Sequence, residues 1–490
     1  MVIQCDKNLG PAIIEREQYI RLVYRDHLND SATYHYMSNS EAKGYIDRIA
    51  YLLRKFIKTH RKSIGRSSCL FLVRSLNAIH KEKSYSQDFP PSTFAQFYAL
   101  AKVHKQPLKT RPVVSYCGSI LHPLGLWLDS QLQPIAMHQQ SYFKSSHTLK
   151  IQMEQLPPIP PSARLFTADA VSMYTNIDTT HALTTISEYL HHNTFVFRDL
   201  PIRTIIDGLR LLMTNTIFQF GDTWWCQKTG TVMGAPPAPP YATIYYGIHK
   251  NELLCKYHPE LLFYKRFIDD VIGIWIPLTP ERWQSFIKDL SYGKLTWDVS
   301  PLSKRVHFMD LTLTIQNQSI TTTLYEKELN LYLYIPPHSA HPPGVLHGLV
   351  IGNILRICNL CSNPHDSHKR ICQFYRRLIF RGYKRHSLLP LFDKALSLFN
   401  TQPPNSHAAD STTDERNRIY LHLPYHPQGP KSSSFQSLFR AHFIQHRFEQ
   451  PYHTYKNKKG ALLHIQRMIV AYNRPHNLRD RIHIDDNFVR

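Results

Sequence analysis

Two adjacent aspartates, Asp269 and Asp270, lie between apolar, β-prone segments in YKRFIDDVIGIW (residues 264–275). Adjacent carboxylates are costly to bury together, because their charges repel and both lose contact with water. A divalent cation removes this cost, and Mg²⁺ usually takes a few carboxylates with phosphate and water as its remaining ligands. The pair is therefore a candidate metal site in a rigid hairpin. The alternative is an ordinary turn, where Asp is common.

A third carboxylate, Asp169, ends another apolar segment in RLFTADAVSMYTNI (residues 164–177). A polymerase needs a carboxylate from a second strand to bridge two metal ions. Tyr174 follows five residues later, and an aromatic ring beneath the sugar of an incoming nucleotide would clash with a 2′-hydroxyl. Such a ring favours DNA synthesis. If Tyr174 is considered alone, the alternative is that it is an ordinary aromatic residue of the hydrophobic core.

Between these two segments lies a loop rich in glycine and proline, KTGTVMGAPPAPPYATIYY (residues 228–246). Gly230 and Gly234 permit close backbone approach, and the prolines delay a helix that we expect to include residues 241–246. A loop of this kind can support a nucleotide and the template base. The alternative is a plain proline-rich turn.

A basic stretch precedes all three segments, in YALAKVHKQPLKTRPVVS (residues 98–115). Its Lys and Arg side chains suit a hairpin that grips a triphosphate, because both bind phosphate strongly. The alternative is a solvated basic loop. The side chains concerned are Lys102, His104, Lys105, Lys109 and Arg111.

The composition points to a nucleic-acid partner. The chain has 490 residues, 58 Lys and Arg against 36 Asp and Glu, and a formal charge of +22. Such a surplus, spread along the chain, attracts a polyanion and is typical of a long nucleic-acid channel. The eight cysteines form no secreted disulfide framework, so a reducing compartment is expected. The sequence shows neither a signal peptide nor an apolar run of membrane-spanning length, and no membrane association is expected.

The surrounding elements mix helix and strand, which predicts an α+β fold with helices after the sheet. Residues 41–60 repeat apolar positions at helical spacing, and other segments alternate as strands do. Pro157–Pro161, Thr401–Asn417 and His426–Ser434 have the composition of breaks or linkers. The expected strands are 165–167, two within 262–275, 306–315 and 321–334, and the expected later helices lie within 345–382.

Taken in order, these segments resemble the fingers motif and motifs A, B and C of reverse transcriptases, and are most similar to those of Penelope-like elements. The resemblance spans nearly the whole chain. The residues that carry it are DKNLGP (6–11), LAKVHK (100–105), RPVVS (111–115), DAVSMYTNI (169–177), GTVMGAPPAPPYA (230–242), RFIDDV (266–271), FMDL (308–311), RGY (381–383) and YNRPHNLRD (472–480).

The resemblance implies two-metal nucleotidyl transfer with Mg²⁺, or Mn²⁺ in its place. By position, Asp169 and Asp269 would ligate both ions, with Asp270 as a supporting carboxylate. Tyr174 would be the sugar gate. Further expected sites are Lys102 and Arg111 on the triphosphate, Gly234 at the nucleotide and template, and Lys105, Lys109 and Arg266 on nucleic acid.

The resemblance also implies a right-hand fold with an antiparallel palm sheet and a helical thumb. The expected partners are an RNA template, a DNA primer or target and dNTPs, in the nucleus. Many Penelope-like proteins carry a C-terminal GIY-YIG endonuclease; no such pattern follows Asp480, so an endonuclease-lacking member or a fragment is expected. The expected parts are fingers and N-terminal region 1–160, palm 161–335 with an interleaved fingers segment, thumb 336–400, flexible linker 401–435 and C-terminal extension 436–490.

Alternatives to this interpretation remain open. The chain could be a catalytically inactive, nucleic-acid-binding remnant of a mobile element, or an RNA-dependent RNA polymerase, against which Tyr174 argues. A separate group in CNLCSNPHDSHKRIC has spacings that could hold Zn²⁺, although an apolar helical face explains it more simply. The members of that group are Cys358, Cys361, His365, His368 and Cys372.

Overall fold

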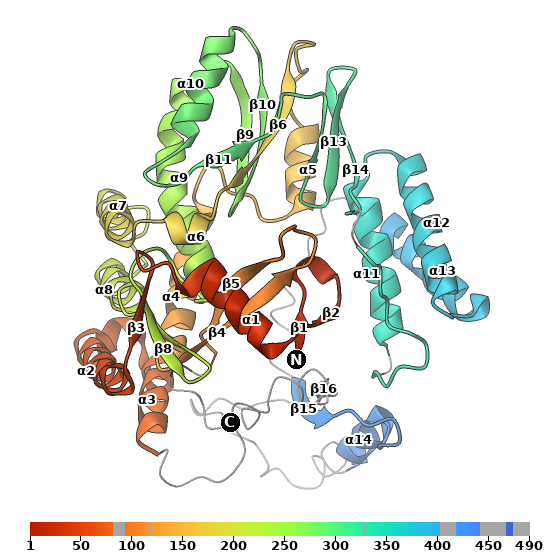
Figure 1. Cartoon of the computed structure of the whole chain (residues 1–490). Coiled ribbons are helices and arrows are strands. Elements are labelled where there is room, and N and C mark those ends of the chain that lie inside the picture. The colour runs from red at the N-terminus through yellow and green to blue at the C-terminus, as the bar shows by residue number, and fades with distance from the viewer. Residues whose placement is uncertain are drawn as a thin grey trace. The chain divides into compact units, whose positions relative to one another are not determined.

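The computed structural model describes residues 1–81, 94–117, 119–327, 330–342, 344–401, 418–441 and 467–473. The chain forms two compact units, Met1–Leu331 and Tyr332–Arg490, which are described separately. The fold mixes helices with antiparallel sheet, as the sequence predicts (Figure 1). In the part of the chain that the structure describes, no helix is long and apolar enough to cross a bilayer.

A four-stranded antiparallel sheet carries the predicted carboxylates. Its strand order is β11-β6-β10-β9, and β9 and β10 form the hairpin expected around the aspartate pair. Each strand alternates its side chains between two faces. The bounds are β6 Arg164–Ala170, β9 Leu261–Phe267, β10 Asp270–Trp275 and β11 Trp297–Val299.

Two helices cover one face of this sheet, α9 (Ala238–Lys256) and α10 (Pro280–Leu290) (Figure 1). Phe166 projects onto α10, with ring centroids 5.2 Å from Trp283 and 5.4 Å from Phe286. Gly273 lies opposite Phe166 in the register, where a Cβ atom would overlap the Phe166 ring. This apolar face leaves the opposite face of the sheet for the carboxylates.

A five-stranded sheet holds the basic stretch. Its order is β3-β8-β7-β4-β5, and the hairpin of β4 and β5 pairs Lys102 with Lys109 and Leu100 with Arg111. Phe97 stacks on Phe218 at 5.2 Å between ring centroids, which anchors β4 on β7. The bounds are β3 Tyr34–Met37, β4 Ala95–Lys102, β5 Lys109–Ser115, β7 Ile217–Phe220 and β8 Thr223–Gln227.

A carboxylate from the π-helical turn η2 (Tyr24–Leu28) fixes the start of β5. Asp26 accepts hydrogen bonds from the backbone N–H and the hydroxyl of Thr110, at 2.8 and 2.9 Å. His27 contacts the same hydroxyl at 2.9 Å, and burial lowers the pKa of His27 to about 4. The neutral imidazole therefore adds no charge to the basic hairpin.

The remaining elements of the first unit pack around these sheets. The long helix α2 confirms the amphipathic helix predicted over residues 41–60, and it begins with a capping box at Ser38 and Glu41. It packs against α3 and α8, while α4 packs against α8 and α9 (Figure 1). The bounds are α1 Arg16–Val23, α2 Asn39–Ile64, α3 Arg66–Lys81, α4 His122–Met137, α5 Ser146–Glu154, α6 Met173–Asn176, α7 Thr179–His192 and α8 Ile202–Met213.

A three-stranded sheet, β12-β13-β14, packs beside β6. A turn at Phe308–Leu311 joins its first two strands, and Met309 in that turn has a left-handed φ of 53°. The third strand ends at Leu324, so the predicted strand 321–334 is shorter than expected. The bounds are β12 Arg305–Phe308, β13 Leu311–Gln316 and β14 Ser319–Leu324.

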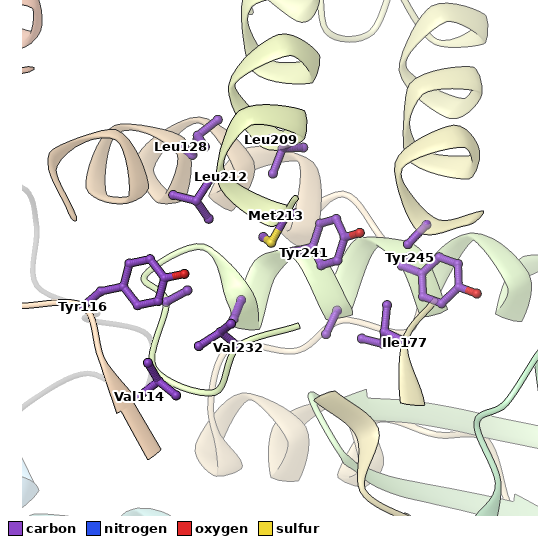
Figure 2. Close-up of a cluster of buried hydrophobic side chains, with 14 of the residues drawn as sticks. Val114, Tyr116, Leu128, Ile177, Leu209, Leu212, Met213, Val232, Tyr241 and Tyr245 are labelled. Carbon is purple, nitrogen blue, oxygen red and sulfur yellow. The ribbon is translucent and has the colours of Figure 1, made fainter. Parts of the chain in front are cut away.

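The glycine–proline loop joins the basic hairpin to the body of the first unit. The backbone N–H of Val114 donates to the carbonyl of Met233 at 2.8 Å. Gly234 has a φ of +118°, and a Cβ atom there would overlap the carbonyl oxygen of Val114. Val232 lies in the same hydrophobic cluster as Val114 and Tyr241 (Figure 2). The loop thereby fixes β5 against α9.

The second unit is helical where it was expected to be. Helices α11 (Val345–Leu360), α12 (Pro364–Phe380) and α13 (Arg385–Thr401) share a core in which Phe374 stacks on Phe392 at 5.7 Å. A parallel pair, β15 (Arg418–Pro424) and β16 (Arg467–Asn473), and the helix α14 (Ser432–Phe439) follow.

The flexible linker predicted over residues 401–435 needs correction in its second half. Residues 402–417 lie outside the described residues. From Arg418 onward the chain forms β15 and α14, because RIYLHLP alternates as a strand does and pairs with β16, with Tyr420 opposite Ile469. Most of the expected extension 436–490, including most of YNRPHNLRD, also lies outside the described residues.

The contact of Gly234 with Val114 predicts that Gly234→Ala destabilises the protein, whereas Gly44→Ala, in a helix outside the loop, should stabilise it. Gly234→Ala must move the backbone of β5 or adopt a strained φ, so it should destabilise the protein by about 2 kcal/mol or more. Gly44, exposed in the second turn of α2, has no atom within 4 Å of a new Cβ, so Gly44→Ala should stabilise by about 0.5–1 kcal/mol. Urea unfolding measures both; equal effects would contradict the docking of the loop.

Candidate active site

Three aspartates stand in one row across neighbouring strands. Asp270 on β10 lies opposite Asp169 on β6, and Asp169 lies opposite Asp298 on β11. Residues paired across an antiparallel ladder point to the same face, with Cβ atoms about 5 Å apart. Like charges in such positions destabilise a sheet, so this row needs positive charge from elsewhere.

Asp269 occupies the turn beside this row. Ile268, which precedes it, has a left-handed φ of 53°, a conformation that costs a non-glycine residue about 1 kcal/mol. The carbonyl of Asp269 accepts the N–H of Ala170 at 2.9 Å, which ties the turn to the end of β6. The structure therefore brings together Asp169, Asp269 and Asp270, the three carboxylates predicted from sequence.

The pKa values of these carboxylates show their mutual repulsion. Burial, followed by the charges of Asp269 and Asp169, raises the pKa of Asp270 to about 6. The pKa of Asp169 is also raised, by burial and then by Asp269 and Asp298. Arg111 acts in the opposite direction on Asp169, which shows that the basic hairpin lies within electrostatic reach of the carboxylates.

Asp298 is a site residue that the sequence reasoning missed. It lies between Trp297 and Val299, which face the covered side of the sheet opposite Ala170 and Ala168. An acidic residue between two apolar residues is a signal of a strand with one polar face. That signal does not reveal the neighbouring strand, so only the sheet order places Asp298 beside Asp169.

A cavity of about 260 Å³ opens beside the row. Within the described residues, no group of three His, Cys, Asp or Glu side chains is placed so that it could hold a metal ion by itself. Mg²⁺ does not require one, because it binds through one or two carboxylates and takes phosphate and water as further ligands. The donor set therefore fits Mg²⁺. The cavity is lined by Thr167, Ala168, Asp169, Asp270, Val271, Asp298, Ser300, His307, Phe308 and Met309.

Arg266 does not have the predicted contact with nucleic acid. It is 2% exposed and lies opposite Val271 in the register, on the covered face of the sheet. The guanidinium donates to the carbonyls of Ile268 and Thr243, both at 2.6 Å. A buried side chain cannot reach a phosphate backbone, so we correct its role: Arg266 supports the turn that presents Asp269.

Tyr174 lies half-buried on the short helix α6, close to the carboxylates. Burial, and then the charge of Asp269, raises its pKa to about 12. The loop holds its backbone, because Thr231 N–H donates to the Tyr174 carbonyl at 2.6 Å and a Cβ on Gly230 would lie 2.7 Å from the same oxygen. The predicted sugar gate is thus beside the predicted metal ligands.

The basic hairpin repeats the charge pattern of the aspartate row with the opposite sign. Lys102 lies directly opposite Lys109 on β4 and β5, and Arg111 is two residues further along the same face. Burial, and then the charge of Arg111, lowers the pKa of Lys102. Lys105 and Lys109 are exposed. Repelling cations that are held on one face suit an anionic ligand.

Gly234 owes its residue type to the backbone of β5, as described above. Its φ of +118° and its contact with Val114 explain the glycine without a nucleotide. Its predicted position at the nucleotide and template stays a prediction.

The five side chains considered for zinc are distributed over α11 and α12. Cys361 follows α11 and is buried, whereas His365 is exposed near the start of α12. Cys372 and His368 lie one helical turn apart, with Sγ and Nε2 separated by 3.5 Å. Among the residues that the structure describes, no such group could hold a metal ion, so the helical-face interpretation is favoured.

Comparisons with known proteins place polymerases among the structural neighbours. Telomerase from Candida albicans, in complex with a TWJ fragment of telomeric RNA, has a TM-score of 0.43 at 11% identity and covers 67% of this chain and 63% of its own. Apo telomerase from Candida tropicalis has a TM-score of 0.40 at 10% identity, with 66% and 65% covered. Sicinivirus 3Dpol RNA-dependent RNA polymerase has a TM-score of 0.36 at 12% identity, with 60% and 64% covered.

The chain spans less than two thirds of the length of these structures. Among family models, an animal helix-turn-helix domain matches residues 333–389, which include α11 and α12. No match is found among the curated proteins. These likenesses are too distant to define the family of the chain.

The raised pKa of Asp270 predicts a pH-dependent effect on stability. Its folded pKa of about 6 lies above the ordinary aspartate pKa of 3.8, so stability from this group is complete below pH 3.8 and is lost as pH rises through 6. In metal-free buffer, Asp270→Asn should therefore raise the Tm at pH 7.5 and have little effect at pH 3.5, where the carboxyl is largely protonated in both the folded and the unfolded protein. Thermal unfolding with EDTA measures this difference; a Tm gain that is the same at both values would contradict the repulsion.

Proposed function

We propose that the chain is an RNA-directed DNA polymerase of a Penelope-like retroelement that transfers nucleotides from dNTPs to a primer 3′-hydroxyl. The observation that carries the proposal is the pair of opposed charge patterns: a row of aspartates across three strands, and a row of cations within electrostatic reach of it. Two-metal nucleotidyl transfer needs these two patterns, one for Mg²⁺ and one for the triphosphate.

In this proposal each side chain has a role that follows from its position. Asp169 and Asp269 hold two Mg²⁺ ions, and Asp270 supports them. When bound, these ions lower the pKa of the primer hydroxyl and stabilise charge on the phosphates. Lys102 and Arg111 orient the triphosphate through charge-assisted hydrogen bonds. Arg266 holds the turn of Asp269 through its hydrogen bonds to the carbonyls of Ile268 and Thr243.

In this proposal, Tyr174 distinguishes deoxyribonucleotides from ribonucleotides. The ring projects from α6 beside Asp269 and is held through its backbone by the glycine loop. A wall beneath the sugar excludes a 2′-hydroxyl sterically. This favours a DNA-making enzyme over the alternative of an RNA-dependent RNA polymerase, with dNTPs as its substrates. The proposed reverse transcriptase would also take an RNA template and a DNA primer, in the nucleus.

Primer extension on an RNA template with dNTPs and Mg²⁺ tests the proposed activity. Asp269→Ala should lower the extension rate by at least about a hundredfold, because several kcal/mol of transition-state stabilisation depends on the metal ions. Asp222→Ala, at an exposed turn between β7 and β8, is the matched control and should extend as the wild type does. Nucleic-acid binding without extension by any variant would favour the inactive remnant.

Substitution of Tyr174 tests the sugar gate. Tyr174→Ala removes the ring and should raise the incorporation of ribonucleotides relative to deoxynucleotides by about ten- to a hundredfold. Tyr174→Phe keeps the ring and should leave the ratio close to that of the wild type. Competition between NTPs and dNTPs in single-nucleotide extension measures the ratio. If the ratio for Tyr174→Ala is unchanged, Tyr174 is not the gate.

A further inference from the structure

A short turn near the N-terminus lies against the basic hairpin. Strands β1 (Val2–Gln4) and β2 (Pro11–Ile13) pair antiparallel, with the 3₁₀ turn η1 (Asp6–Asn8) between them. Cys5 forms a parallel bridge with Ala101 of β4, and its N–H donates to the Gly10 carbonyl at 3.1 Å. The turn therefore has a fixed position next to Lys102.

Asp6 of this turn is buried and faces a cation of the predicted triphosphate site. It is 5% exposed, and its Oδ2 lies 3.5 Å from a guanidinium nitrogen of Arg111. Within the described residues, this Oδ2 has no hydrogen-bond donor. A buried carboxylate is costly without a cation, so Asp6 restrains Arg111 while the Arg111 side chain stays 45% exposed.

Lys7, the next residue, has an unfavourable backbone conformation. Its φ of 64° and ψ of 36° are left-handed, which costs a non-glycine residue about 1 kcal/mol. Such strain in a non-glycine residue is often found at functional sites. The Lys7 side chain is exposed, so packing does not explain why a lysine occupies this position.

The charge of Lys7 reaches both halves of the candidate active site. It lowers the pKa of His104, after the larger effect of burial. It also opposes the rise in the pKa of Asp169, together with Arg111. Lys7 is thus within electrostatic reach of His104 in the basic hairpin and of Asp169.

We propose that the turn Cys5–Gly10 is part of the triphosphate-binding site, in which Lys7 contacts the phosphates and Asp6 positions Arg111. The inference deepens the proposed function and rests on it for the identity of the ligand. Lys7 then adds a third positive charge to those that Lys102 and Arg111 supply from the hairpin. The strained backbone is the cost of directing a long cation to this place.

Equilibrium binding of fluorescently labelled dTTP to the full chain, with Mg²⁺ and a dideoxy-terminated primer on an RNA template, tests Lys7. Lys7→Gly relieves the backbone strain, so its Tm should equal or exceed that of the wild type. Its Kd for dTTP should nevertheless rise about tenfold, as expected for a lost charged contact. Lys7→Arg keeps the charge and should bind nearly as the wild type does.

Three controls test whether Lys7 and Asp6 affect dTTP binding through contact with the phosphates rather than through a general change in charge or structure. Lys58→Ala removes an exposed lysine of α2 and should leave the Kd unchanged. Labelled dTMP should show little difference between wild type and Lys7→Gly, because it lacks the outer phosphates. Asp6→Asn should weaken dTTP binding in the wild type and not in an Arg111→Met background, because Asp6 acts through Arg111.

The outcomes distinguish this inference from the proposed function. Unchanged dTTP affinity in Lys7→Gly, or no dTTP binding by the wild type, overturns the role of Lys7. If the wild type extends primers while Lys7→Gly keeps the same KM for dTTP, the polymerase stands and the inference fails. Lys7-dependent binding of dTTP without any extension supports the triphosphate site and contradicts the polymerase.

Discussion

Repulsion between like charges held on one face of a sheet is the constraint on which the candidate site depends. The register across β11, β6 and β10 gives Asp298, Asp169 and Asp270 no freedom to separate, because they are paired residues of adjacent strands. The hairpin of β4 and β5 imposes the same condition on Lys102 and Lys109. Such rows destabilise the sheet unless protonation or ions of the opposite sign reduce their charge.

The back of the sheet provides the rigidity that this arrangement requires. Trp275, Phe166 and Phe286 pack between the sheet and α10, and Arg266 binds carbonyls on two elements. Lys250 of α9 is fully buried nearby, with its Nζ 4.4 Å from the centroid of the Tyr246 ring and 3.2 Å from the Leu290 carbonyl. Burial, and then the charge of Arg266, lowers the pKa of Lys250 far below its usual range, so the buried cation that interacts favourably with Asp269 is Arg266.

Adjacent residues were easier to predict than residues brought together by the sheet. The Asp269–Asp270 hairpin and the strand of Asp169 follow from local patterns, and the structure confirms both elements. Asp298 could not be found in this way, because its strand has only three residues and its neighbour depends on the strand order. Arg266 was assigned wrongly, since its charge suggested a nucleic-acid contact. The two-residue turn between β9 and β10 places it opposite Val271, on the covered face.

The glycine loop makes its key contacts through backbone atoms on both sides. At one end it meets the carbonyls of Tyr174 and Thr175, and at the other it meets Val114 of β5. The separation between the aromatic ring and the cations of the hairpin is therefore set by peptide geometry, whatever side chains lie between the two glycines. The site would therefore favour nucleotides whose distance from sugar to phosphates matches this separation. Substitutions at residues 231–233 would change the affinity for a nucleotide and leave this preference for its length unchanged.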